Sequence, residues 1–173
     1  MITLRCTKRF LNYMGIVPDT INQPTTALLG DWYVNLIPVY FGDLILFLNE
    51  KSLLTTVIPI YESSNLFALF RNRLANLLAM IGIPREVIVE EINHYTQIKF
   101  GKTKSRSILG SMNDFAWHYK ILIDETQNNF AINLSEFEYR LSQMPCKLLN
   151  YQFPEDVARM LLSMKLKHHT NNS

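Results

Sequence analysis

The sequence is poor in the residues that mark metal-binding, redox and disulfide-rich proteins. It contains only two cysteines, Cys6 and Cys146, which stand at opposite ends of the chain in neither CxxC nor CxxH spacing. This pattern indicates no zinc knuckle and no redox pair, and it favours reduced thiols in the cytoplasm. The four histidines fall in no metal-ligand spacing such as HExxH, so we expect neither a metal site nor a cofactor.

A strong net charge and a long apolar run are absent as well. Lys and Arg number 17 against 15 Asp and Glu, and a net charge of +2 gives no reason to expect the whole surface to bind nucleic acid or membrane. The first ten residues lack the apolar segment of a signal peptide, and the most apolar run, residues 33–48, is interrupted by Asn35, Pro38 and Asp43. We therefore expect no signal peptide, no membrane contact and a cytoplasmic location.

Enough apolar residues are present to build one core. Of the 173 residues 48% are hydrophobic, which predicts a single domain over residues 1–167 and a frayed tail at 168–173. Residues 2–6 alternate as a half-buried strand does, and Thr7 is placed to cap a short helix that ends near Gly15.

Two later segments complete the predicted fold. Residues 32–60 are rich in Val, Ile, Leu, Tyr and Phe with turn signals between the runs, which predicts a β-meander whose middle strand, 44–48, is covered on both faces. Residues 66–81 repeat Leu and Phe at helical spacing. Another helix is predicted at 84–95, with Glu86, Glu90 and Glu91 facing outward. A further helix is predicted to start between residues 105 and 111, and two shorter helices are predicted at 135–144 and 154–165. We predict an α+β fold with a mostly antiparallel sheet covered by these helices.

The segment FGKTKSRSILGSMND, residues 100–114, contains the densest group of positive charges. A nucleotide-binding P-loop would need a glycine at Thr96 and a strand in place of the helix predicted before it, so a P-loop is not indicated. Two interpretations stay open. The segment is either a connection in which Ser105 or Ser107 caps the next helix, or a contact to phosphate groups through its lysines and arginine.

Two other segments contain groups that could perform chemistry. Asp114 and His118 lie four residues apart on one helical face, with Ser111 nearby. The pair is compatible with an acid–base site, but such a pair on a helix surface is far more often a local ion pair. LGDWYVN places Asp31 beside Trp32, either as a turn with core aromatics or as part of a groove that recognises a ligand.

Four blocks together resemble one bacterial family. They are LRCTKRFLNYMG (4–15), LGDWYVNL (29–36), FGKTKSRSILGSMND (100–114) and MPCKLLNYQFP (144–154). The family is the domain of unknown function numbered 6933, and the resemblance extends to about Leu162. It implies no assigned activity, substrate or cofactor. Members are similar in being small bacterial proteins, some encoded on mobile or defence-related DNA.

The blocks of this family mark a set of ligand-binding candidates. If the family has a site, the resemblance implies that the early strand and the basic segment converge to form it, with donors suited to an anion or nucleotide. The candidate residues are Lys102, Thr103, Lys104, Arg106, Asn113, Asp31, Trp32 and Asn35.

Three hypotheses about function follow. The first is a binding module that recognises nucleic acid or an anionic ligand through residues 99–106. The second is an accessory subunit, antitoxin-like or associated with a mobile element or defence, that binds a protein partner. The third is a small enzyme that uses Asp114 and His118 as an acid–base pair with Ser111 beside them.

Overall fold

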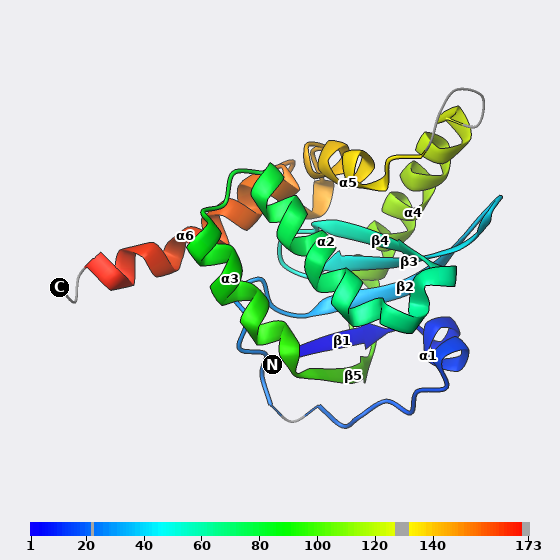
Figure 1. Cartoon of the computed structure of the whole chain (residues 1–173), viewed down its shortest axis with the longest axis horizontal. Coiled ribbons are helices and arrows are strands. Elements are labelled where there is room, and N and C mark those ends of the chain that lie inside the picture. Colours follow the sequence, from blue (N-terminus) through cyan, green and yellow to red (C-terminus); the bar gives the residue numbers. More distant parts are fainter. Residues whose placement is uncertain (22, 127–131, 171–173) are drawn as a thin grey trace.

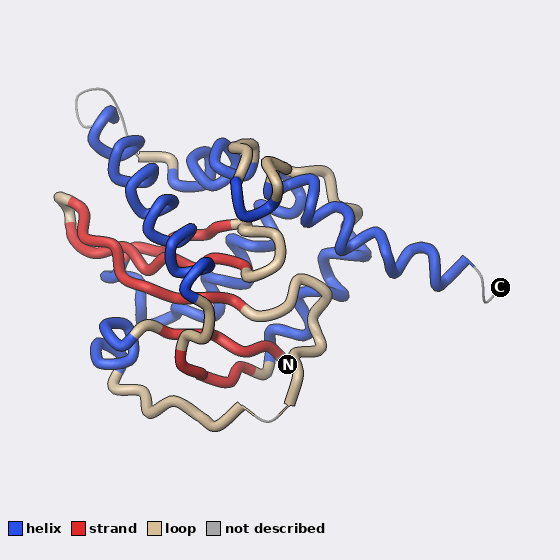
Figure 2. The backbone as a smooth tube through the Cα atoms, turned by 180° about the vertical axis from the view of Figure 1, so that it is seen from behind, coloured by secondary structure: helices blue, strands red, loops and turns tan. Residues whose placement is uncertain are grey.

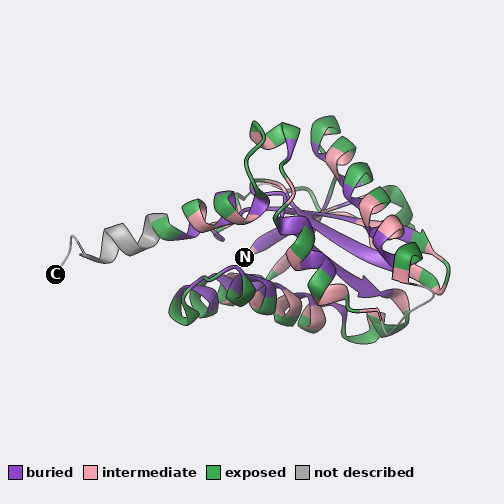
Figure 3. Cartoon of the chain, turned by 90° about the horizontal axis from the view of Figure 1, so that it is seen from above, coloured by how far each residue is buried: buried purple, intermediate pink, exposed green. Residues whose placement is uncertain are grey.

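A five-stranded sheet forms the centre of the molecule, and helices pack on both of its faces (Figure 1, Figure 3). The structure is a computed structural model that describes residues 1–21, 23–126 and 132–170, with residues 164–170 as backbone only. The elements in chain order are β1 (Ile2–Cys6), α1 (Lys8–Met14), β2 (Trp32–Val39), β3 (Gly42–Asn49), β4 (Thr55–Pro59), η1 (Ile60–Asn65), α2 (Leu66–Met80), α3 (Arg85–Asn93), η2 (His94–Thr96), β5 (Ile98–Lys102), α4 (Arg106–Thr126), α5 (Leu134–Ser142), η3 (Lys147–Leu149) and α6 (Pro154–Thr170). Residues 171–173 of the predicted tail lie outside the described residues.

The sheet combines the predicted meander with a parallel part. Its strand order is β4-β3-β2-β1-β5, with β2, β3 and β4 antiparallel and β1 parallel to both β2 and β5. The α+β prediction, the first strand, its Thr7 cap and the central position of residues 44–48 are confirmed. Parallel neighbours arise because α1 and the long loop after it carry the chain back before β2 begins.

The prediction of a loop where β5 lies is wrong. The density of positive charge predicts a basic loop at residues 99–106, whereas the structure places residues 98–102 in an edge strand beside β1. Its first three side chains are half-exposed, and at five residues containing a glycine the strand gives only a weak signal in the sequence. The pairing with β1 joins segments almost a hundred residues apart, which no local pattern records.

The sheet separates two hydrophobic cores. Side chains of α1, α2, α3 and α6 pack on one face with Trp32 and Val34 of β2. Side chains of α4 and α5 pack on the other face with Tyr33 and Ile37 of the same strand. Figure 2 shows α4 crossing this second face. Alternate residues of a strand point to opposite faces, so each central strand contributes to both cores.

Both edges of the sheet are covered by other parts of the chain. At β5, the Asp19 amide donates to the Phe100 carbonyl at 2.6 Å, and the Asp19 carboxylate accepts from the Phe100 amide at 3.2 Å. At β4, the Val57 amide donates to the buried Glu138 carboxylate at 2.8 Å. Such cover protects edge groups from pairing with another chain.

The outward position predicted for Glu91 was wrong. Glu91 is buried, and its carboxylate accepts hydrogen bonds from the Leu28 and Leu29 amides at 2.9 and 3.1 Å and from the Tyr95 hydroxyl at 3.2 Å. The carboxylate thereby provides hydrogen-bond partners for backbone amides of the loop before β2. The helical repeat of α3 in the sequence does not reveal that this loop lies beside Glu91.

Within the described residues, no helix is both long enough and apolar enough to cross a bilayer.

Candidate functional site

A crevice lies at the carboxyl ends of β1 and β5. The two strands run parallel and end side by side, with Cys6 opposite Lys102. The chain then enters α1 on one face of the sheet and α4 on the other. In sheets with parallel strands, the point where successive connections leave to opposite faces is the usual place for a ligand.

The crevice has the size of a small-molecule site. Its volume is about 520 Å³, within the range typical of ligand pockets. It is lined by Cys6, Lys8, Leu11, Asn12, Ile16, Pro18, Lys102 and Thr103. Its lining combines apolar side chains from α1 and the following loop with polar groups from α1 and from the end of β5.

The two lysines of the crevice have no acidic partner. Lys8 and Lys102 are exposed, and neither forms an ion pair with any described residue. Asp19 follows the lining residue Pro18, but its carboxylate accepts a hydrogen bond from the Phe100 amide and forms no ion pair with either lysine. The ammonium groups are therefore available to an anion from solution.

The thiol in the crevice is not an activated nucleophile. Cys6 is a free, buried cysteine, and burial raises its pKa to about 12. At neutral pH the group is a neutral thiol, whereas reactive cysteines have a lowered pKa. The Cys6 thiol is thus unsuited to act as a nucleophile at neutral pH.

Lys104 turns to the other face of the sheet and is paired there. Its ammonium lies 3.4 Å from the Glu50 carboxylate and 3.8 Å from Asp31 Oδ2. Asp31 Oδ2 also accepts from Arg5, whose Nε and Nη2 both lie at 3.0 Å. Two cations and two carboxylates balance each other here, so this cluster offers an anion less than the crevice does.

Two buried oxygens beside these ion pairs lack a hydrogen-bond partner among the described residues. They are Thr3 Oγ1 on β1 and Asp31 Oδ1 just before β2. Burial is the main cause that raises the pKa of Tyr33. Gly101 lies beneath this cluster, and a Cβ at that position would stand 3.0 Å from Arg5 Nη1.

The remaining ligand-binding candidates do not all reach the crevice. Trp32 is fully buried and donates from Nε1 to the Tyr95 hydroxyl at 2.8 Å, so it cannot stack on a ligand. Asn35 Oδ1 accepts from the Thr7 hydroxyl at 2.8 Å, next to the end of β1. Arg106 begins α4, and Asn113 lies about two turns further along the same helix; both are exposed.

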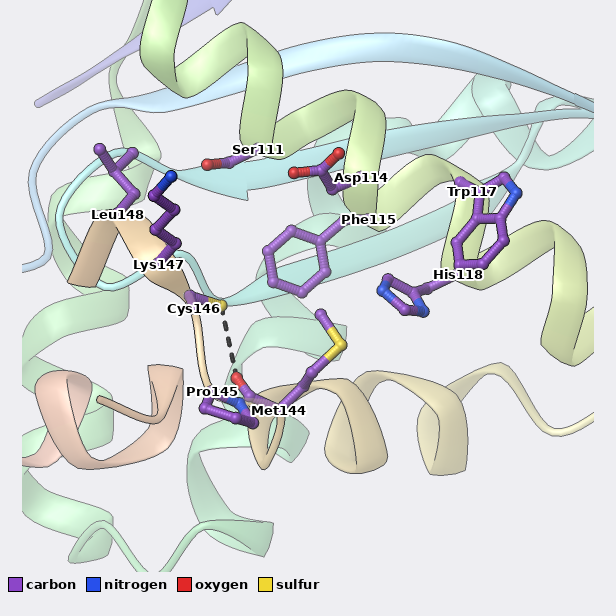
Figure 4. A pocket seen from close by; sticks show the side chains of 10 residues that line it. All are labelled: Ser111, Asp114, Phe115, Trp117, His118, Met144, Pro145, Cys146, Lys147 and Leu148. Atoms are coloured by element: carbon purple, nitrogen blue, oxygen red, sulfur yellow. Dashed lines mark hydrogen bonds between the residues drawn. The ribbon is translucent and has the colours of Figure 1, made fainter. Parts of the chain in front are cut away.

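Ser111, Asp114 and His118 line a second cleft, shown in Figure 4. No described contact joins the three by a hydrogen bond, and the His118 ring instead packs edge-on against Trp117 with centroids 5.0 Å apart. The opposite side of the cleft contributes Cys146, whose pKa is raised to about 11 by burial and by the charge of Asp114. The residues are close, but the hydrogen bonds of an acid–base pair are not formed.

The comparison with protein families agrees with the resemblance described above. A family described as "Domain of unknown function (DUF6933)" matches residues 3–157. The chain belongs to this family. No curated protein and no solved structure matches it. The matched residues of this DUF6933 chain include β1 from Thr3 onward, the four other strands and every residue that lines the crevice.

Sequence reasoning missed Lys8 and Asn12 as crevice residues. Lys8 follows the Thr7 cap directly after β1, and a polar turn between a strand and a helix was the available signal. Without β5, a turn after β1 has no neighbouring strand end with which to form a crevice, so this signal could not identify the site. Only the parallel pairing of β1 with β5 brings Lys8 and Lys102 to one opening.

Proposed function

We propose that this protein binds a phosphate-bearing small molecule of nucleotide size in the crevice at the ends of β1 and β5. The observation that supports the proposal most is the pair of unpartnered lysines, Lys8 and Lys102, at the mouth of a cavity of about 520 Å³. An ammonium group without a carboxylate partner gains most from a phosphate oxygen.

The other lining groups suit the remainder of such a ligand. The Thr103 hydroxyl and the Asn12 amide can donate to phosphate or sugar oxygens. Leu11, Ile16 and Pro18 form an apolar wall against which a base or another flat apolar group can pack. Lysine acts as a mobile point charge, so the two ammonium groups recognise the negative charge of a ligand without imposing one fixed geometry.

A small ligand agrees with the structure better than a long nucleic acid does. The basic residues of positions 99–106 point in different directions, because Lys102 faces the crevice and Lys104 is paired on the opposite face. A nucleic-acid surface would require several free cations on one side. The acid–base alternative receives less support, since no hydrogen bond among the described residues links Asp114 to His118.

Calorimetric titration with inorganic phosphate, AMP, ADP and ATP tests the proposal. We expect at least one nucleotide to bind, and Lys8→Ala and Lys102→Ala each to weaken binding about tenfold, the size expected for a hydrogen bond to a charged group. Arg106→Ala is the matched control, because it removes one positive charge from the same segment outside the crevice. It should change the affinity less than about twofold.

Two results would contradict the crevice as the site. One is the absence of heat with all four ligands. The other is an Arg106→Ala effect equal to that of Lys102→Ala, which would indicate a diffuse field. A parallel anisotropy titration with single-stranded DNA and RNA over a salt series shows whether polymers bind, since each phosphate contact steepens the salt dependence.

A further inference from the structure

A groove runs along α4 and contains the second cleft. Two cavities of about 340 and 490 Å³ adjoin one another and share His118, Met144 and Pro145. They extend along α4 from Ser111 to Glu125. We name this feature the α4 groove. It has no residue in common with the crevice at the ends of β1 and β5.

The two walls of the α4 groove carry opposite charges. The α4 wall contributes Asp114 and Glu125, and the facing wall contributes Arg140 from α5 and Lys147 from η3. All four side chains are exposed, and none forms an ion pair with a described residue. The groove thus has one acidic and one basic wall whose charges remain available.

Between the charged walls the lining includes several apolar side chains. Phe115, Leu122 and Leu141 line the cavities and are buried. At one end Trp117 and Leu148 are 59% and 43% exposed. A partly exposed tryptophan beside a pocket is the kind of residue that contributes most to protein–protein binding.

The facing wall keeps its shape through its own hydrogen bonds. The Cys146 amide donates to the Gln152 carbonyl at 3.1 Å, the Tyr151 amide donates to the Cys146 carbonyl at 2.9 Å, and the Cys146 thiol donates to the Met144 carbonyl at 3.3 Å. A wall that is already ordered lowers the entropic cost of binding.

The spacing of the charges sets the length of an occupant. Asp114 and Glu125 are eleven residues apart on one helix, about 16 Å at a rise of roughly 1.5 Å per residue. An extended chain covers that distance with about five residues. Side chains of an extended peptide alternate in direction, so successive residues can meet the two walls in turn.

We infer that the α4 groove binds an extended segment, about five residues long, of a protein partner. This segment presents basic side chains to Asp114 and Glu125, acidic side chains to Arg140 and Lys147, and apolar groups to the floor. A single small ligand would meet only one end of the groove, whereas a peptide satisfies both pairs of charges.

Selection of random peptides displayed on phage, followed by fluorescence anisotropy with the labelled synthetic peptides, tests the inference. We expect enriched peptides that combine basic, acidic and apolar residues within one short stretch. Asp114→Lys/Glu125→Lys should weaken their binding at least tenfold and should itself select peptides with acidic residues in place of the basic ones. Glu62→Lys/Glu86→Lys is the matched control, because both residues are exposed and line none of the cavities described here. It should leave the affinity within twofold.

Failure of selection to enrich any peptide would overturn the inference. So would enriched peptides that bind Asp114→Lys/Glu125→Lys as tightly as the unchanged protein. All four substituted positions are exposed, so circular dichroism should show the same fold in every variant. Nucleotide binding at the crevice should be unchanged in the charge-reversed protein, which separates this inference from the proposed function.

Discussion

At the residue scale, Gly101 is required for space rather than for an unusual backbone angle. A Cβ there would lie 3.0 Å from Arg5 Nη1, 3.0 Å from Ile21 Cγ1 and 3.3 Å from Thr3 Cγ2. We expect Gly101→Ala to lower the free energy of unfolding by about 1–3 kcal/mol, because either Arg5 must shift away from Asp31 or the loop that contains Ile21 must move. Urea denaturation followed by circular dichroism measures the change.

Gly110 provides the opposite control for this substitution. It lies inside α4, and a Cβ there would meet nothing within 4 Å. Gly110→Ala should therefore stabilise the protein by about 0.5–1 kcal/mol, since alanine loses less backbone entropy in a helix. Equal effects of the two substitutions would show that crowding at Gly101 does not matter.

At the scale of elements, Glu138 joins α2 and α5 across the edge of β4. Its Oε1 accepts from the Val57 amide and from Arg73 Nε, both at 2.8 Å. Burial raises the pKa of Glu138 from its ordinary value of 4.5 to about 7, although the Arg73 charge and the Val57 amide oppose that rise. The folded protein therefore holds the proton more tightly than the unfolded chain does.

The direction of the resulting pH dependence follows from this raised pKa. Below pH 4.5 the contribution of Glu138 to stability is complete, and it is lost as the pH rises toward 7. The stability of the unchanged protein relative to Glu138→Gln should fall by up to about 3 kcal/mol between about pH 4.5 and 8, at roughly 1.4 kcal/mol per pKa unit.

Chemical denaturation of both proteins over this pH range measures the difference. Glu136→Gln, an exposed change on the same helix, should show no such trend. A pH-independent difference between the unchanged protein and Glu138→Gln would mean that Glu138 stays ionised throughout.

Elements whose burial repeats locally could be predicted from the sequence, and those fixed by distant partners could not. β1 and α2 show their period within a few residues, the meander shows apolar runs separated by turn signals, and the structure confirms all three. β5 and the buried Glu91 depend on β1 and on the loop before β2. The same limit applies to the site. Asp31 and Lys104, both named as candidates from the sequence, do meet in the structure. Lys8 was missed, because only the pairing of β1 with β5 brings it close to Lys102.

At the scale of the whole molecule, the two cores share their strands. In β2 the residues Trp32 and Val34 belong to one core, and Tyr33 and Ile37 belong to the other. Loss of either helical layer would expose one face of every central strand, so neither core should persist without the other. We expect the chain to unfold in a single cooperative transition.

The two tryptophans allow this cooperativity to be measured. Trp32 is fully buried in the core on the α2 face, whereas Trp117 is 59% exposed on α4. In Trp117→Phe the fluorescence reports only the core around Trp32, while far-UV circular dichroism includes the 21-residue α4 on the opposite face. Both signals should give the same urea midpoint. A fluorescence midpoint clearly below the circular dichroism midpoint would show that the α2 face opens first and that the shared strands do not couple the two cores.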